Sequence, residues 1–209
     1  DGNQIVFDEF DRNRPGWDVW KYDLKRHVKT RFTFSKDLDF GRWPVWYSDG
    51  SGIIFSTGNS TMRTSLMTKS SDGSGKENLL FEAEEYWRAT GMSPDAQFVL
   101  LTSQIAKTGK FHISYFDKKG ENKPISLVTS EYNLRNGQFS PDGKWIVFQS
   151  DESGKDEIYA VSFPTLGYKR QISQDGGKLP RWDRSGKFIY YISGEFMISQ
   201  EVNTENEFK

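Results

Sequence analysis

Four basic residues recur at a constant place in the sequence and are the first candidates for chemistry. Each lies seven residues before one of the turns that divide the chain into similar segments; they are Arg42, Arg88, Arg135 and Lys178. Guanidinium and ammonium groups bind carboxylates and phosphates, and several around one opening attract anions. The spacing therefore predicts an anion-binding site. Local neutralisation by acids a few positions earlier is the competing interpretation; these acids are Asp39, Glu84, Glu85, Glu131 and Asp175.

The residues that catalysis requires do not form a recognisable set. The chain has no cysteine, which excludes disulfides and thiolate zinc sites, and its two histidines are His27 and His112. Both are interpreted as surface or satisfied strand residues rather than as bases. No G-x-S-x-G segment is present, so a serine-hydrolase interpretation has no nucleophile. We therefore expect no catalytic residues, no cofactor and no turnover of peptide, ester, phosphate or glycoside substrates by this chain.

Two acidic loops raise the question of calcium. One contains Asp37 and Asp39, and the other is "DESGKDE" at 151–157. Neither has the full carboxylate series of a calcium loop, so both are interpreted as polar turns and no metal site is expected. The segment "DGSGKE" at 72–77 lacks the spacing of a phosphate-binding loop and is interpreted as a hairpin loop.

The candidate cations belong to a sequence repeat that is marked by similar turns. Turns with Asp-Gly or a close variant recur every 43 to 48 residues, and each precedes an apolar segment such as "KWIVFQS". The turns are anchored at Asp1, Asp49, Asp95, Asp142 and Ser185. Glycine tolerates a positive φ and aspartate bonds to its own backbone, so both suit tight turns. Ala96 replaces glycine in the third turn, and we expect another turn type there.

Each repeat contains the material for one four-stranded antiparallel sheet. A large apolar residue lies three positions before four of the anchors and is expected in the core between sheets; these residues are Trp46, Met92, Phe139 and Trp182. Four short strands in about 45 residues are typical of a β-propeller blade. The sequence therefore predicts an all-β propeller, formed as a single domain over residues 1–209. Five repeats are visible, of which three are complete and the first and last are partial.

The partial repeats predict that more polypeptide is needed to close a ring. The first lacks the strand before its turn, and the last stops before a fourth strand. A six-bladed ring at about 46 residues per blade would need about 276 residues. We expect the chain to be part of such a ring, with the missing strands supplied from outside Asp1–Lys209 or by a partner.

Three long segments resemble a known group of bacterial propellers. They are "RWPVWYSDGSGIIFST", "GQFSPDGKWIVFQSDESGKDEIYAVSFP" and "QISQDGGKLPRWDRSGKFIYYISGEFMISQEV". The repeat resembles TolB-type, WD-like propeller repeats, and the three segments are similar to the propellers attached to bacterial transmembrane serine/threonine kinases and related regulators. The resemblance covers essentially the whole chain. It implies a non-catalytic recognition or sensing domain of a larger bacterial protein, outside the cytoplasm and with a membrane span upstream.

Two other functions stay open at this stage. One is the gating propeller of a prolyl-oligopeptidase-type hydrolase, whose catalytic domain would lie beyond Lys209; the other is a free TolB-like periplasmic scaffold. The net charge of −1 argues against nucleic acid as a partner. No apolar run approaches the roughly 18 residues that span a bilayer, so we expect no membrane contact by this segment itself. The expected partner is a protein or a small anionic ligand at the channel mouth.

Overall fold

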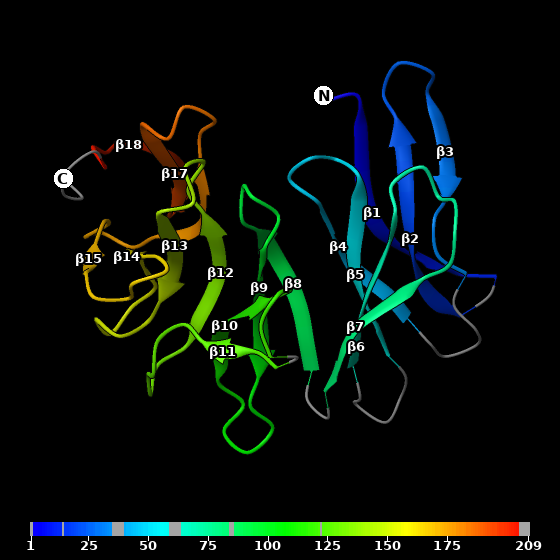
Figure 1. Ribbon diagram of the computed structural model, residues 1–209. Coiled ribbons are helices and arrows are strands. Elements are labelled where there is room, and N and C mark those ends of the chain that lie inside the picture. The colour runs from blue at the N-terminus through cyan, green and yellow to red at the C-terminus, as the bar shows by residue number, and fades with distance from the viewer. Residues whose placement is uncertain are drawn as a thin grey trace. The chain divides into compact units, whose positions relative to one another are not determined.

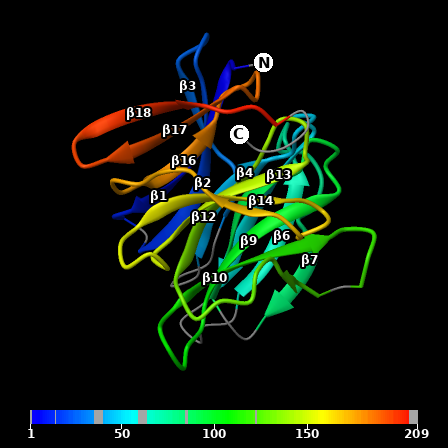
Figure 2. The ribbon, with the colours of Figure 1, turned by 90° about the vertical axis from the view of Figure 1, so that its left-hand side faces the viewer.

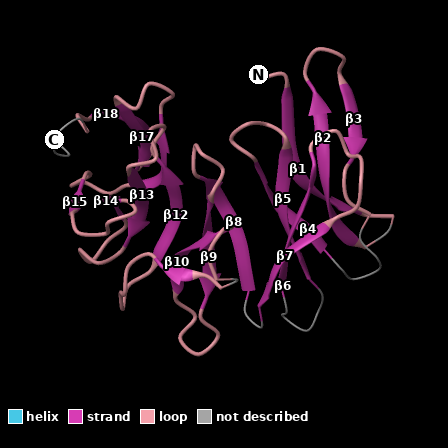
Figure 3. Ribbon diagram, in the orientation of Figure 1, coloured by secondary structure: helices cyan, strands magenta, loops and turns pink. Residues whose placement is uncertain are grey.

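The computed structural model describes residues 2–13, 15–34, 40–58, 64–83, 86–121 and 123–204. The regular elements of these residues are eighteen β-strands, and Figure 3 shows strands and loops without a helix among them. The all-β class is therefore confirmed. No helix in the described ranges is long and apolar enough to cross a membrane. The chain divides into two compact units, residues 1–89 and 90–209, and each is described by itself. The expectation of a single domain stays a prediction.

Unit 1 contains two successive repeats in one sheet (Figure 1). The strands of the first are β1 (Gln4–Asp11), β2 (Gly16–Asp23) and β3 (Val28–Arg31). Those of the second are β4 (Phe40–Trp46), β5 (Gly52–Gly58), β6 (Thr64–Ser70) and β7 (Asn78–Ala83). Strands that follow one another within a repeat pair antiparallel, and a parallel contact of Trp17 with Phe40 joins the two repeats.

Unit 2 contains three further sheets in chain order. The first begins with β8 (Tyr86–Met92), which crosses the unit boundary, and continues with β9 (Phe98–Gln104), β10 (Phe111–Asp117) and β11 (Ile125–Ser126). The second is formed by β12 (Leu134–Phe139), β13 (Trp145–Ser150), β14 (Glu157–Ser162) and β15 (Lys169–Gln171). The third is formed by β16 (Lys178–Trp182), β17 (Phe188–Ser193) and β18 (Phe196–Glu201), with β18 at its edge in Figures 1 and 2. The two complete sheets are four-stranded and antiparallel, as the fold class predicts.

The repeated turns share one backbone geometry in their four described copies. The residue after the anchor has a φ of 75° at Gly50, 57° at Ala96, 74° at Gly143 and 72° at Gly186. Its N–H donates to the carbonyl three residues earlier in every copy. The expectation of another turn type at Ala96 is therefore wrong, because the turn imposes the left-handed conformation even on alanine. The first anchor, Asp1, lies outside the described residues.

The expected core residues are buried with one exception. The exposed fraction is 9% for Met92, 6% for Phe139 and 9% for Trp182. Trp46 is only half-buried, although it packs against the apolar cluster that includes Val19. Its other side lines a cavity, which is described with the candidate sites below.

In each unit, a hydroxyl residue just after a repeat's last strand forms hydrogen bonds with a buried carboxylate and a backbone N–H of the preceding strand. In unit 2, Glu157 is fully buried and accepts a hydrogen bond from the Ser173 hydroxyl, which itself accepts one from Ile158 N at 2.8 Å. In unit 1, Thr33 donates to the fully buried Asp18 at 2.9 Å and accepts from the following backbone N–H, that of Val19, also at 2.9 Å. The hydroxyl supplies the partner that each buried group requires.

Candidate recognition sites

A bulge follows the repeated cation in three of the inner strands, which are the first strands of their repeats. The pairing with the next strand shifts directly after Arg42 in β4, Arg135 in β12 and Lys178 in β16. The residue after each cation has a positive φ: 54° at Trp43, 55° at Asn136 and 55° at Leu179. For a residue other than glycine, this conformation costs about 1–2 kcal/mol. Bulges redirect side chains and are frequent beside functional sites, so these strand beginnings are candidates for binding.

Arg42 of unit 1 lies against two aromatic rings. Its guanidinium carbon is 3.7 Å from the centre of the Trp17 ring and 4.6 Å from that of Trp43. Its Nε donates to Oδ2 of Asp8 at 2.7 Å, and 28% of the side chain is exposed. Contact with an aromatic face restrains the orientation of a guanidinium. Arg42 is therefore an oriented, partly accessible cation with one carboxylate partner in the part of the chain that the structure describes.

The aromatic cluster extends from Arg42 to the start of the next inner strand. The Trp43 ring makes edge contacts with Phe40, at 5.6 Å between ring centres, and with Tyr86, at 4.9 Å. Burial raises the pKa of Tyr86, while the positive charges of Arg42 and Arg88 act in the opposite direction. The tyrosine is consequently a neutral hydroxyl near pH 7, within electrostatic reach of two of the four candidate cations.

The two candidate cations of unit 2 have different surroundings. The guanidinium carbon of Arg135 lies 4.3 Å from the centre of the Phe111 ring, and its Nη2 is 3.4 Å from the Asn133 side-chain oxygen. Burial alone would raise the pKa of Asp151, but hydrogen bonds from Asn133 and the charge of Arg135 outweigh it and lower the pKa. Lys178 is 61% exposed and lies 3.6 Å from Asp156. Both cations therefore have acids near them.

Gln149 connects the two bulges of unit 2. Its side-chain oxygen accepts hydrogen bonds from Nδ2 of Asn136 at 3.0 Å and from the N–H of Leu179 at 3.3 Å. Gln149 is 5% exposed, so these bonds hold both left-handed residues from inside the unit. In unit 1, Asp8 is the residue at the same distance from its anchor, and it bonds to Arg42.

The structure places the sequence-predicted cations two in each unit. In unit 1, the charges of Arg42 and Arg88 both act on the pKa of Tyr86. In unit 2, Arg135 and Lys178 lie near the starts of β12 and β16. A single ring formed by all four stays a prediction. Of the acids expected to neutralise them, Asp39, Glu84 and Glu85 lie outside the described residues.

The sequence interpretation did not find Asp8, Trp17, Trp43 and Tyr86. Trp17 and Asp8 reach Arg42 from the preceding repeat, so spacing alone could not reveal them. One signal was available at the second bulge, because asparagine is enriched at positive φ and Asn136 follows the cation directly.

The acidic loop at 151–157 has protein partners for each of its carboxylates. Asp151 accepts from Asn133 at 2.6 Å, Glu152 pairs with Lys169, and Asp156 pairs with Lys178. Glu157 accepts from Gly176 N at 2.9 Å in addition to its serine partner. Asp37 and Asp39 lie outside the described residues. Among the residues that are described, no group of three or more His, Asp or Glu side chains is placed to hold a metal ion.

Neither histidine belongs to an inner strand that carries a candidate cation. His27 has a φ of 55° in the turn after β2, and its Nδ1 is 3.3 Å from the Tyr22 hydroxyl. His112 lies in β10 opposite Ser103 of β9. Neither forms part of a recognisable acid–base arrangement in the described ranges.

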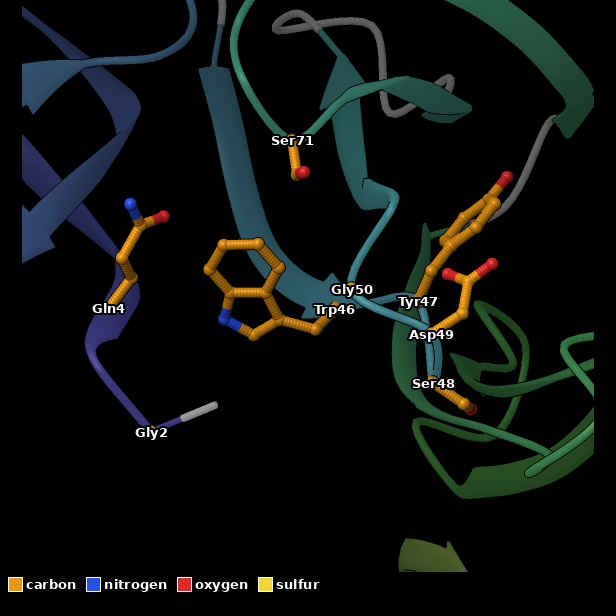
Figure 4. Close-up of a pocket in the computed structure, with 8 residues that line it drawn as sticks. All are labelled: Gly2, Gln4, Trp46, Tyr47, Ser48, Asp49, Gly50 and Ser71. Atoms are coloured by element: carbon orange, nitrogen blue, oxygen red, sulfur yellow. The ribbon is translucent and has the colours of Figure 1, made fainter.

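A separate cavity of about 610 Å³ opens at the second repeated turn in unit 1 (Figure 4). The Trp46 indole lies between Gln4 of β1 on one side and Gly50 of the turn on the other, with Ser71 above and Gly2 below in this view. Tyr47, Ser48 and Asp49 complete the lining and project from the far side of the strand end. This cavity exposes the indole that repeat position would place in the core.

The fold is that of TolB-like β-propellers. The sequence matches no family model, and no curated protein matches it. TolB from Acinetobacter baumannii superposes with a TM-score of 0.75 over 97% of this chain at 19% identity. The chain spans about half of that protein's length, 51%.

Two enzymes also contain the fold. Oligogalacturonate lyase from Vibrio parahaemolyticus superposes with a TM-score of 0.67 at 12% identity, over 96% of this chain and 60% of the lyase. Prolyl oligopeptidase B from Galerina marginata has a TM-score of 0.68 at 9% identity, over 99% of this chain and 32% of the peptidase. At such identities the similarity establishes the architecture alone.

Proposed function

We propose that this chain is a non-catalytic recognition propeller that binds a carboxylate-bearing group of a protein or small molecule at the bulged beginnings of its inner strands. The observation that carries the proposal is Arg42, a cation in contact with the Trp17 and Trp43 rings and still partly exposed. A guanidinium that is already oriented loses little freedom when a carboxylate binds, which favours binding.

The surroundings of Arg42 set the expected strength of binding. Arg88 adds a second positive charge beside Tyr86, whose neutral hydroxyl can donate a hydrogen bond to an anion. Asp8 competes for the same guanidinium and lowers the local positive potential. We therefore expect weak, salt-sensitive binding, with the aromatic rings providing contact area for the rest of the ligand.

The proposed setting is a larger extracytoplasmic bacterial protein. The resemblance to propellers attached to transmembrane kinases supports a sensor whose membrane span and kinase lie elsewhere in the polypeptide. The TolB-like fold supports a free scaffold in the same compartment.

The proposal is tested by titrating the chain with a short poly-glutamate peptide and following tryptophan fluorescence, since Trp17 and Trp43 contact Arg42. Binding should weaken as salt rises from about 50 mM to about 500 mM. Replacing Arg42, Arg88 and Arg135 together with glutamine should abolish it, with circular dichroism to verify the fold.

The matched control is Lys123→Gln, which removes an exposed lysine that pairs with Glu121. This variant should bind the peptide as the native chain does. Native affinity in the triple variant, or an equal loss in both variants, would reduce the cations to ordinary surface charges.

A second candidate function is the gating propeller of a prolyl-oligopeptidase-type hydrolase. It is favoured by the superposition of 99% of this chain on prolyl oligopeptidase B. The flanking gene sequence distinguishes the two, because the hydrolase requires a G-x-S-x-G domain in the same polypeptide and the sensor requires a membrane span and a kinase.

A further inference from the structure

Gln149 of unit 2 joins two strands that belong to different repeats. It lies in β13 opposite Arg135 of β12, and β16 of the next repeat packs against both strands. Its side-chain oxygen accepts hydrogen bonds from the side chain of Asn136 at 3.0 Å and from the N–H of Leu179 at 3.3 Å. These two residues directly follow Arg135 and Lys178 in the sequence. One buried amide therefore restrains the backbone next to both candidate cations of unit 2.

The fold does not require this bridge. The residue seven positions after the anchor is Gln149 in the fourth repeat, Ser56 in the second and Thr102 in the third. The hydroxyls of Ser56 and Thr102 are buried, and neither has a hydrogen-bond partner in the part of the chain that the structure describes. A short side chain is therefore tolerated at this position, although a buried polar group without a partner lowers stability. The reach of Gln149 to the next repeat is a property of this residue and not of the sheet.

The bridge stabilises an unfavourable backbone conformation at two places. Asn136 and Leu179 both have a φ of 55°, which is unfavourable for residues other than glycine. The shared acceptor holds this conformation at both bulges and so fixes where each neighbouring cation leaves its strand. Cations that are held in place before a ligand arrives lose less freedom when one ligand contacts both of them.

We propose that Arg135 and Lys178 form a second anion-binding site, for a ligand with at least two carboxylates, and that Gln149 is its positioning residue. Asp151 lies within electrostatic reach of Arg135, and Asp156 is 3.6 Å from Lys178. A single carboxylate therefore gains little at either cation, whereas a ligand that contacts both gains twice. Gln149 acts through the backbone beside the two cations. The inference rests on the proposed function, because it assumes that the repeated cations bind carboxylates.

The test uses the full chain with Arg42→Gln and Arg88→Gln, which removes the candidate cations of unit 1. The probe is the short poly-glutamate peptide, and its binding at about 50 mM salt is measured by isothermal titration calorimetry. In this background, Gln149→Met should weaken binding about tenfold, because the ligand then has to order both cations. Methionine is similar in size to glutamine but is only a weak acceptor.

Gln138→Met is the matched control. The side-chain oxygen of Gln138 accepts a hydrogen bond from the N–H of Trp182 at 2.8 Å, so this glutamine also joins β12 to β16. Its bond lies after the bulges of both strands, away from the two cations. Both glutamine variants should lower the midpoint of urea unfolding, and only Gln149→Met should weaken peptide binding.

A double-mutant cycle separates positioning from a general loss of structure. Gln149→Met and Lys178→Gln together should weaken binding by less than the product of their separate effects, because Gln149 acts through Lys178. A purely structural role of Gln149 would make the two effects multiply.

Three results would overturn the inference: native affinity in the Gln149→Met variant, an equal loss in the Gln138→Met variant, or effects that multiply in the cycle. Peptide binding by the native chain but not by the chain with Arg42→Gln and Arg88→Gln would also overturn it, and would leave the proposed recognition at Arg42 in place. Absence of binding by the native chain would refute the proposed function and this inference with it.

Discussion

Loss of the buried Ser173 hydroxyl should lower the free energy of unfolding of unit 2 more than loss of an exposed hydroxyl. Ser173→Ala removes the donor to the buried Glu157 carboxylate and the acceptor of the Ile158 N–H at once. A hydrogen bond to a charged group contributes about 1.5–3 kcal/mol, and a buried donor left unpaired costs about 1–3 kcal/mol. Some relaxation will occur, so we expect a loss of about 3 kcal/mol in the free energy of unfolding.

Water is not expected to replace the missing hydroxyl. A Cβ built on Gly177 would lie only 2.6 Å from Oγ of Ser173, which shows how closely this backbone approaches the site. The space left by one oxygen atom is too small for a water molecule with two or more partners. The full cost of the unpaired groups should therefore be measurable.

The assay is equilibrium urea unfolding followed by tryptophan fluorescence, with Ser162→Ala as the matched control. Ser162 also donates one hydrogen bond, to Thr165 O at 2.5 Å, and accepts one, from Tyr168 N at 3.2 Å, but at an exposed position. The control should lose less than about 1 kcal/mol. A double variant with Glu157→Gln should cost less than the two single variants together, because the groups interact directly. Equal losses for Ser173→Ala and Ser162→Ala would refute the reasoning.

Three further predictions use the same unfolding assay. Ala96→Gly should stabilise the chain by about 0.5–1 kcal/mol, because the strain energy removed at this positive φ exceeds the cost of the extra entropy of the unfolded chain. Gly186→Ala should destabilise the chain by a similar amount. A change of the same sign in both variants would contradict this reasoning. Gly177→Ala should cost more than about 2 kcal/mol, because its Cβ would lie 2.6 Å from Cγ1 of Ile158, and a native midpoint would show that the backbone gives way freely. Hydrogen bonds from Ser185 hold the pKa of Asp183 at about 2, below 3.8, so its contribution is complete above about pH 4 and is lost as the pH falls through about 2. Asp183→Asn should therefore be less stable than the native chain at about pH 5, and the difference should shrink as the pH falls toward about 2; a constant difference would argue against this linkage.

The sequence predicts the strands because their signals are local. The turn Ser140-Pro141-Asp142-Gly143 and the apolar run after it predict β13 from a few neighbouring residues. Asp142 accepts a hydrogen bond from Lys144 N at 3.1 Å, as is usual for aspartate in a turn. The Ala96 turn shows the limit of this logic. There the surrounding hairpin, rather than the residue, sets the backbone conformation.

The candidate sites could be predicted only in part, because they combine residues from different repeats. The constant spacing of the cations identified Arg42, but its carboxylate partner, Asp8, lies 34 residues away. Trp43 and Leu179 have no intrinsic preference for positive φ, so their bulges result from strand pairing and not from local propensity. Periodicity likewise placed Trp46 in the core, and only the structure shows one of its sides lining a cavity.

The bulges of the inner strands have an evolutionary consequence. An extra residue interrupts the alternation of side chains, so the part of the strand before the bulge and the part after it follow separate inward and outward patterns. The part after the bulge contains the core aromatic, Trp46 in β4 and Trp182 in β16, and mutations there disturb an apolar cluster. The part before it follows its own pattern and contains the cation, Arg42 in β4 and Lys178 in β16. A duplicated repeat can therefore acquire new residues where each inner strand begins, one blade at a time, while the scaffold that holds the blades together is inherited unchanged.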